Sequence, residues 1–272
     1  MPPTTTLQNV FNSCDAAAVA CSGGVDSMTL AYSAHQSMGQ RVTIFHAVSP
    51  AVPPVATRRV KDYAAREDWN LKIVNAGEFD DENYMQNPAN RCFYCKSNLY
   101  SALSQHANGA QLFSGTNMDD LGDWRPGLVA ADNNAVRHPF VEAGLTKTDV
   151  RALAARYGLD DIAELPSAPC LSSRVETGIR INAGALRSID KVETLLRNRL
   201  TPDTVRCRVR SDGVVIELDQ ATLSTLDDQT QRELATEIEQ SFFNTTASSN
   251  TGMTVYFAAY NRGSAFLQDT LK

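Results

Sequence analysis

The sequence has no apolar run long enough to cross a membrane, because its longest apolar stretches are short and interrupted by polar residues. Its first residues, MPPTTTLQNVFNSCDAAAVA, lack the charged start and the apolar run of a secretory signal. It also has no internal repeat and no low-complexity tract. These absences argue against a membrane partner and predict a cytoplasmic protein.

Positive charge is scarce as well: 25 Lys and Arg stand against 31 Asp and Glu, which gives a formal net charge of −6 and a pI near 5.3. Such a balance provides no general attraction to a phosphate backbone, so we expect a small-molecule substrate rather than a nucleic acid. Cysteine is sparse, with 6 in 272 residues at uneven spacing. That density excludes a disulfide scaffold and indicates reduced thiols that serve chemistry or metal binding.

Hydrophobic residues make up 43% of the chain, enough for one large core and a second, smaller one. The first half alternates β-rich runs with helical patterns, which predicts an open, doubly wound α/β domain with a mainly parallel sheet. We place its strands at Ala16–Cys21, Val42–Val48, Leu71–Val74 and Ala110–Phe113. We place its helices at Met28–His35, Val55–Arg66, Tyr94–His106 and Lys147–Tyr157, the last with Thr146 as its N-cap.

The pattern changes after Cys170, which indicates a smaller C-terminal α+β domain. A Ser-Asp-Gly turn joins two predicted strands, and the polar run Asn244–Gly252 is expected to be a loop. The other expected elements are helices at Ala183–Leu200 and Asp228–Phe242 and strands at Val205–Arg210, Val214–Leu218 and Met253–Tyr260. The predicted domains are therefore residues 1–172 and residues 173–272.

The strongest motif is the glycine-rich loop Ser22-Gly23-Gly24-Val25-Asp26-Ser27, which follows the first predicted strand and precedes a helix. Adjacent glycines let backbone amides approach an anion, and the helix N-terminus favours negative charge. The loop lacks the lysine of GxxxxGK[ST] and the spacing of GxGxxG. It matches the PP-loop of ATP pyrophosphatases, which cleave ATP between the α and β phosphates. We therefore expect ATP, with Asp26 holding Mg²⁺ on the phosphates, and an ordinary glycine turn is the alternative.

A second segment, Ser114-Gly115-Thr116-Asn117-Met118-Asp119-Asp120, follows another predicted strand and carries carboxylates where ligands bind in open α/β sheets. We expect it at the same crevice as the loop. Arg125 follows closely and is suited to clamp a phosphate or a carboxylate. Helix capping is the alternative for Asp119 and Asp120.

Three longer stretches carry a family resemblance: GTNMDDLGDWRPGLVAA, HPFVEAGLTKTDVRALAARYGL and APCLSSR. With the loop, they resemble the LarE family of sulfur transferases for the nickel-pincer nucleotide cofactor, from about Ala18 to Arg174. VRCRVRSDGVVIE and AAYNRGS extend the resemblance more weakly. It implies that the carboxylates of pyridinium-3,5-biscarboxylic acid mononucleotide are adenylylated, with AMP and pyrophosphate as products, and then converted to thiocarboxylates. It also implies a homo-oligomer.

The resemblance assigns further residues. It completes the nucleotide site formed by the loop with three more residues, Asn117, Asp119 and Arg125. Cys170 matches the cysteine that supplies sulfur in single-cysteine members of the family, and Ser173 and Arg174 would lie beside the reacting centre. An Arg-x-Arg pair would bind the anionic substrate, and its members here are Arg208 and Arg210, which face the same way on a strand. The chain departs from the family at Leu196, where an acidic residue is expected.

The segment RCFYCK carries a CxxC, Cys92 and Cys95, whose spacing alone is ambiguous among zinc, a redox dithiol and an iron–sulfur cluster. No histidine lies in an obvious partner motif for zinc. A thioredoxin-like dithiol usually opens a helix in its own βαβ fold, which is not the expected context. With Cys170, three thiolates suffice for a [4Fe–4S] cluster with one open iron, and some LarE-like proteins hold such a cluster. The remaining cysteines are expected to be core residues: Cys14, Cys21 and Cys207.

Several alternatives stay open. In a cluster route, sulfide at the open iron attacks the activated carboxylate, and a sulfide source or a cysteine desulfurase is a possible partner. In a sacrificial route, Cys170 gives up its own sulfur and becomes dehydroalanine. A tRNA-thiolating PP-loop enzyme, an amidating synthetase and a non-catalytic ATP- or cluster-binding regulator are the other readings. The acidic balance disfavours tRNA, and a CxxC has no role in an amidating synthetase.

Overall fold

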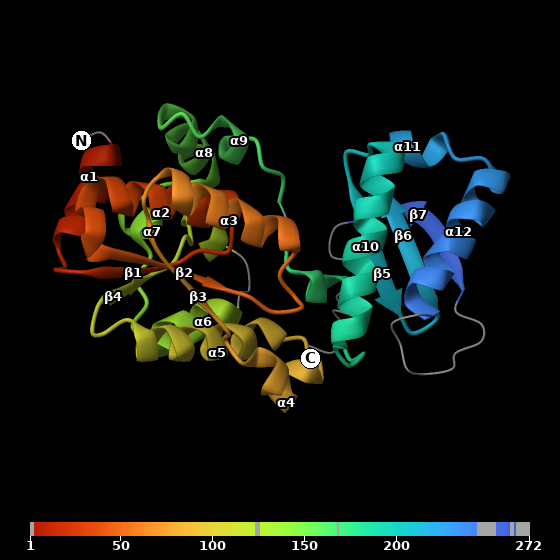
Figure 1. Cartoon of the computed structure of the whole chain (residues 1–272), viewed down its shortest axis with the longest axis horizontal. Coiled ribbons are helices and arrows are strands. Elements are labelled where there is room, and N and C mark those ends of the chain that lie inside the picture. The colour runs from red at the N-terminus through yellow and green to blue at the C-terminus, as the bar shows by residue number, and fades with distance from the viewer. Residues whose placement is uncertain (1–2, 123–125, 168, 244–253, 262–263, 265–272) are drawn as a thin grey trace. The chain divides into compact units, whose positions relative to one another are not determined.

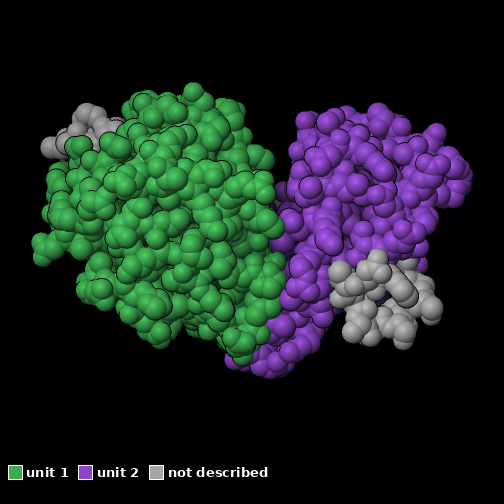
Figure 2. Space-filling view, in the orientation of Figure 1, with its two compact units in different colours: residues 1–81, 90–168 green, residues 82–89, 169–272 purple. Residues whose placement is uncertain are grey.

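In a computed structural model of the chain, the structure describes residues 3–122, 126–167, 169–243, 254–261 and 264. They form two compact units (Figure 2): unit 1 is Met1–Asp81 with Asn90–Ala168, and unit 2 is Glu82–Ala89 with Pro169–Lys272. The boundary expected after residue 172 therefore lies at Pro169, and unit 2 also takes in a short earlier segment. Asn87 attaches the short segment Glu82–Ala89 to unit 2, because its side-chain amide donates to the backbone oxygens of Glu176 at 2.8 Å and Ile179 at 2.9 Å.

Unit 1 is built on a four-stranded sheet with the order β3-β2-β1-β4, in which every pair of neighbours is parallel (Figure 1). The strands are β1 Ala17–Ala20, β2 Val42–Ala47, β3 Asn70–Val74 and β4 Gln111–Phe113. Their ends lie within one residue of the predicted positions. The prediction of a mainly parallel α/β fold is confirmed.

Helices cover both faces of this sheet (Figure 1). Val19 and Ile44 pack into the core cluster on the side of α2, whereas their neighbours Ala18 and Phe45 pack with Tyr100 of α5 on the other side. Both faces of the two central strands, β1 and β2, are therefore buried, as their continuous apolar runs indicate, whereas the edge strand β3 is largely exposed. The α-helices of unit 1 are α1 Pro3–Asn12, α2 Val25–Met38, α3 Pro54–Arg66, α5 Arg91–His106, α6 Pro126–Asn133, α7 Pro139–Glu142, α8 Lys147–Arg156 and α9 Asp160–Ala163. Its 3₁₀ helices are η1 Gly39–Arg41, η2 Glu78–Asp80 and η3 Met118–Leu121.

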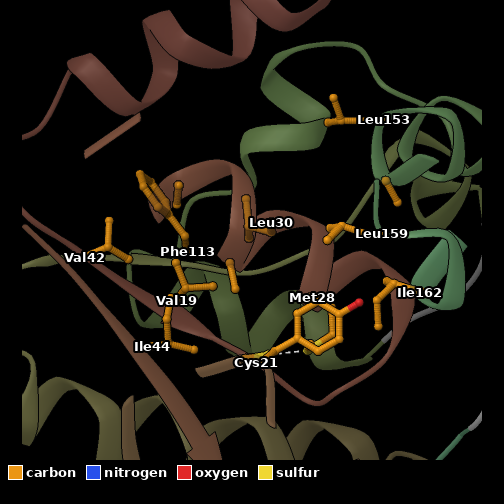
Figure 3. Packing of buried hydrophobic residues seen from close by; sticks show 14 of the residues in the cluster. Val19, Cys21, Met28, Leu30, Val42, Ile44, Phe113, Leu153, Leu159 and Ile162 are labelled. Atoms are coloured by element: carbon orange, nitrogen blue, oxygen red, sulfur yellow. Dashed lines mark hydrogen bonds between the residues drawn. The ribbon is translucent and has the colours of Figure 1, made fainter. Parts of the chain in front are cut away.

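The first strand and the first long helix share one tightly packed core (Figure 3). Cys21, just after β1, is 3% exposed and its Sγ lies 3.5 Å from the Sδ of Met28 in α2. Burying side chains of this kind stabilises a fold by roughly 1.5–3 kcal/mol each, so the segment between β1 and α2 is anchored at both ends. α2 begins at Val25 rather than at Met28, which places the last residues of SGGVDS inside the first turn of the helix.

Unit 2 contains a three-stranded sheet with the order β5-β6-β7, in which β5 and β6 are antiparallel and β6 and β7 are parallel. Its elements are α4 Glu82–Met85, η4 Leu171–Arg174, α10 Ala183–Leu200, β5 Val205–Arg210, β6 Gly213–Leu218, α11 Gln220–Ser224, α12 Asp228–Phe243 and β7 Val255–Ala259. The smaller α+β domain is confirmed, and the loop expected at Asn244–Gly252 lies outside the described residues. No helix in the part of the chain that the structure describes is long and apolar enough to cross a membrane.

Candidate active site

The glycine-rich loop joins β1 to α2 and exposes backbone amides at the start of that helix. Gly24 is the N-cap of α2, with φ −86° and ψ 166°, and the first helical bond runs from Met28 N to Gly24 O at 3.0 Å. The amides before Met28 have no partner within the helix, as at any helix N-terminus. Ser27 ties the turn together, because its Oγ accepts from Ser22 N at 3.0 Å and donates to Gly24 O at 3.1 Å. This arrangement suits an anion such as a phosphate.

Glycine is required at two places around the loop. Gly23 has φ +84°, and a Cβ there would lie 2.9 Å from the backbone oxygen of Ala56 in α3. A Cβ on Gly115, just after β4, would lie 2.9 Å from the backbone carbon of Asp26. At Gly24, by contrast, a Cβ would meet only Ser22 Oγ at 3.7 Å. Gly23 and Gly115 therefore allow the backbone to pack closely, whereas Gly24 keeps space open in front of the loop.

Asp26 is the centre of a polar cluster. Its Oδ1 accepts from Asn117 Nδ2 at 3.2 Å, and its Oδ2 pairs with Lys147 Nζ at 2.5 Å. The backbone amide of Lys147 in turn donates to Asp119 Oδ2 at 2.8 Å. The structure thus brings the Ser114–Asp120 segment to the loop, as expected. Lys147 was expected only as the first residue of a helix, and no signal in the sequence pairs it with a carboxylate 121 residues earlier.

Asp26 fits a role in cation binding. Its side chain is 27% exposed and already carries the Lys147 ammonium as a partner, so a positive charge is accommodated at this carboxylate. Mg²⁺ prefers such oxygen ligands. Asp120 has the capping role foreseen as its alternative, because its Oδ2 accepts from Asn117 N at 3.1 Å and closes a capping box. Arg125, the remaining residue expected at the nucleotide, lies outside the described residues.

In unit 2, hydrogen bonds to backbone carbonyl oxygens hold the chain around Cys170 in place. Cys170 is exposed at the start of η4, and its carbonyl oxygen accepts from Ser173 Oγ at 2.7 Å and from Arg174 Nη1 at 3.3 Å. Arg174 Nη1 also donates to the carbonyl oxygen of Pro169 at 2.7 Å. Both residues expected beside Cys170 therefore bind its backbone and leave its thiol exposed.

The guanidinium of Arg174 forms a buried, two-point ion pair with Glu193 of α10. Nε donates to Oε1 at 2.9 Å and Nη2 to Oε2 at 3.1 Å, and the two side chains are only 3% and 1% exposed. Burial raises the pKa of Glu193, but the hydrogen bonds and charge of Arg174 outweigh it, so the net pKa is lowered. Leu196, one turn further along α10, is fully buried. Glu193 thus supplies a buried carboxylate one turn before the position where an acidic residue is expected.

Arg208 and Arg210 on β5 meet the same carboxylate, that of Glu217 on β6. Arg208 Nε donates to Oε2 at 2.7 Å and Arg210 Nη2 to Oε1 at 3.0 Å. The prediction that the two arginines face the same way is confirmed. Two guanidinium groups share one carboxylate here, so the trio carries a net positive charge. Arg210 is 25% exposed, and its buried Nε has no hydrogen-bond partner among the described residues.

Cys92 is exposed and Cys95 is half-buried, and both lie in the first turns of α5. Residues three apart on a helix share a face, so these two thiols lie on one side of α5. The helix expected from Tyr94 begins at Arg91, so the CxxC does open a helix. The helix start expected at Tyr94 was wrong, so the position of the CxxC in a helix does not by itself distinguish a redox dithiol from a cluster.

The third proposed ligand, Cys170, belongs to unit 2, whereas Cys92 and Cys95 belong to unit 1. Within the described ranges, no three His, Cys, Asp or Glu side chains gather as a metal ion requires. Cys21 and Cys207 are buried core residues, as predicted, and burial raises the pKa of the Cys21 thiol to about 11 and that of Cys207 well above its ordinary value. Cys14 is half-buried against the same core as Cys21. The two exposed thiols, those of Cys92 and Cys170, therefore both belong to motifs.

The parallel sheet and the SGGVDS loop at the end of its first strand define an α/β protein of the PP-loop class. No family model matches the chain. It is 30% identical over 223 residues to the pyridinium-3,5-bisthiocarboxylic acid mononucleotide synthase of Lactiplantibacillus plantarum, which covers 79% of this chain and 80% of that protein. The chain therefore belongs to the LarE family, which transfers sulfur in the biosynthesis of the nickel-pincer cofactor.

Two further relatives are uncharacterized proteins. One, from Synechocystis sp., is 36% identical over 218 residues, with 78% of this chain and 80% of that protein covered. The other, from Methanocaldococcus jannaschii, is 26% identical over 204 residues, with 74% and 77% covered. The characterized relative is a synthase, so the chain is an enzyme.

Proposed function

We propose that this protein is an ATP-dependent sulfur transferase that adenylylates the carboxylates of pyridinium-3,5-biscarboxylic acid mononucleotide and converts them to thiocarboxylates. The observation that carries the proposal is the loop between β1 and α2, where free helix amides, an open space at Gly24 and the Asp26 carboxylate lie together. A triphosphate chain needs each of these features. The relationship to the bisthiocarboxylic acid mononucleotide synthase favours this substrate over tRNA.

In the activating step, a carboxylate oxygen of the substrate attacks the α-phosphorus of ATP, and the bond to the β-phosphate oxygen breaks. The products are an acyl-adenylate and pyrophosphate. The loop amides would stabilise the negative charge that develops on the leaving pyrophosphate, and Lys147 would place a positive charge beside it. Asp26 would hold Mg²⁺, which supplies charge neutralisation on the phosphates. Arg125 would complete this site.

In the transfer step, sulfur attacks the acyl carbon and AMP leaves. We favour a [4Fe–4S] cluster held by Cys92, Cys95 and Cys170, which would bind external sulfide, or persulfide sulfur from a cysteine desulfurase after two-electron reduction by a thiol. Cys92 and Cys170 are exposed and Cys95 is half-buried, whereas Cys21 and Cys207 are buried, and this difference supports that donor set. In the sacrificial alternative, Cys170 Sγ forms a thioester, the Cα proton is lost and the Cβ–Sγ bond breaks. Thiocarboxylate and dehydroalanine are then the products.

Substrate binding is assigned to the unit 2 arginines. The trio of Arg208, Arg210 and Glu217 has one positive charge in excess, which suits the phosphate or carboxylates of a mononucleotide. Arg210 is the more exposed of the two arginines, at 25% against 6%, so an anion reaches it more readily. Ser173 and Arg174 would hold Cys170 in place rather than contact the anion, because their donors bind backbone oxygens and Glu193.

The cysteines test the sulfur route. Cys92→Ala, Cys95→Ala and Cys170→Ala should each abolish the brown absorbance of anaerobically purified protein and its sulfur transfer. Carboxylate adenylylation should persist, because the loop is untouched. Iron and sulfide assays measure the cluster, and mass spectrometry of the products measures sulfur transfer and adenylylation. Cys14→Ala is the matched control, because Cys14 is half-buried against the core and belongs to no motif.

The sacrificial route has a different signature. The protein would contain no iron, only Cys170→Ala would lose transfer, and Cys170 would lose the mass of hydrogen sulfide after one turnover. Normal transfer by Cys92→Ala and Cys95→Ala together with that mass loss would disprove the cluster.

A further inference from the structure

We propose that Arg59 of α3 is a positioning residue for the PP-loop, which turns the peptide group between Gly23 and Gly24 so that its amide faces the phosphates. The inference rests on the proposed function and extends it to a residue outside every motif of the sequence. Arg59 Nη1 donates to the carbonyl oxygen of Gly23 at 2.7 Å, across 36 residues of sequence. Arg59 is half-buried, and this bond joins α3 directly to the loop.

A trans peptide group holds its carbonyl oxygen and the following amide on opposite sides. If the Gly23 oxygen points to Arg59 on α3, the Gly24 amide points away from α3. The conformation is reached only because Gly23 has φ +84° and because the loop lies directly against Ala56. Arg59 therefore selects one orientation of a peptide group that two glycines would otherwise leave free to rotate.

The neighbouring carbonyl groups of the loop are held in the same manner. The oxygen of Cys21 accepts from His46 Nδ1 at 2.8 Å, and His46 Nε2 lies 2.9 Å from Thr57 Oγ1 in α3. The oxygen of Gly24 accepts from Met28 N and Ser27 Oγ. Three carbonyl oxygens of the segment thus have protein partners, and Ser22 N is bound by Ser27 Oγ, so the orientation of the peptide groups in the loop is fixed by the protein.

Burial lowers the pKa of His46, so its ring is neutral at pH 7 with the proton on Nδ1, as the contact with a carbonyl oxygen requires. Of the side chains that hold the loop carbonyl oxygens from this side, His46 is therefore neutral and Arg59 carries the one formal charge. This charge would also lie near phosphates bound at the loop, so the experiment must separate the hydrogen bond from a general electrostatic attraction.

The test uses the full chain and inorganic pyrophosphate with Mg²⁺ as the probe. Arg59→Ala should weaken pyrophosphate binding by about tenfold, the loss of roughly one charged hydrogen bond. Hydrogen exchange at the Gly23–Ser27 amides should become faster in the same variant. Arg59→Lys should restore most of the affinity, because its ammonium can donate to the same oxygen. Titration calorimetry and exchange mass spectrometry provide the two readouts.

Arg58→Ala is the matched control, because Arg58 is the exposed neighbour and carries the same charge. Equal losses in Arg58→Ala and Arg59→Ala would overturn the inference, since charge alone would then explain both. Unchanged affinity and exchange in Arg59→Ala would overturn it too. If Arg59→Ala does not fold, Arg59→Met keeps the apolar stem and is measured instead. A wild-type chain that binds neither pyrophosphate nor ATP would overturn the proposed function as well.

Discussion

Gly24→Val is expected to reduce adenylylation by roughly 100-fold or more while the protein remains folded. Gly24 has ordinary extended backbone angles, and a Cβ there would meet only Ser22 Oγ at 3.7 Å. Valine therefore adds no backbone strain, but its methyl groups occupy the space where the loop amides would meet phosphate. ATP binding, AMP release and the thermal unfolding midpoint are the measurements.

Gly23→Ala is the control, because it should lose stability, whereas Gly24→Val should lose activity and remain folded. Its φ of +84° and the 2.9 Å approach to the Ala56 oxygen mean that a side chain strains the backbone and pushes against α3. We expect this variant to lose stability by about 1–2 kcal/mol or more, which lowers the unfolding midpoint. A Gly24→Val protein that adenylylates its substrate normally would show that the phosphates do not lie against this loop.

Glu193→Ala is expected to lower the free energy of unfolding by about 3–5 kcal/mol, because it leaves the guanidinium of Arg174 buried without its partner. The amide of Cys207 would also lose its acceptor, since it donates to Glu193 Oε1 at 3.1 Å. Chemical denaturation followed by circular dichroism measures the change. Glu237→Ala is the matched control, because Glu237 pairs with Arg199 at an exposed site and should change little.

The pH dependence follows from the same pair. Arg174 holds the pKa of Glu193 below its ordinary value of 4.5, so the stabilisation is complete above that pH and is lost as the pH falls through the lowered pKa. The difference between wild type and Glu193→Ala should therefore shrink in acid. An equal difference at pH 7 and at pH 3 would contradict an ionised Glu193.

Replacing both partners separates stability from sulfur transfer. A double variant with Arg174→Met and Glu193→Met should recover much of the lost stability, because no buried charge remains. It should not recover sulfur transfer, because the carbonyl oxygen of Pro169 loses its Arg174 donor and that of Cys170 keeps only its bonds from Ser173. Full recovery of transfer would show that Arg174 has no part in holding Cys170.

The regular elements follow from local patterns. Strands buried on both faces read as apolar runs, and the Thr146 cap with its Asp149 partner forms the predicted start of α8. The start of α5 was missed by three residues, because the polar Arg91 and the two cysteines hide the helical period. Helix ends depend on a few weak signals and shift easily.

The candidate site was predictable where it lies within one motif and not where tertiary packing assembles it. The hairpin turn pairs Arg206 with Glu217, which places Glu217 diagonally from Arg208, so that contact could be deduced from the register. The partners of Asp26 and Arg174 could not, because Lys147 and Glu193 reach them through the fold of separate helices. Arg59 likewise contacts the loop only because α3 packs against it.

In the proposed reaction, this chain activates a carboxylate by transferring AMP to it. The direct measurement is product analysis by mass spectrometry after anaerobic incubation of the protein with ATP, Mg²⁺, sulfide and pyridinium-3,5-biscarboxylic acid mononucleotide. We expect AMP and pyrophosphate in equal amounts, together with a thiocarboxylate product. Release of ADP and phosphate would contradict the account.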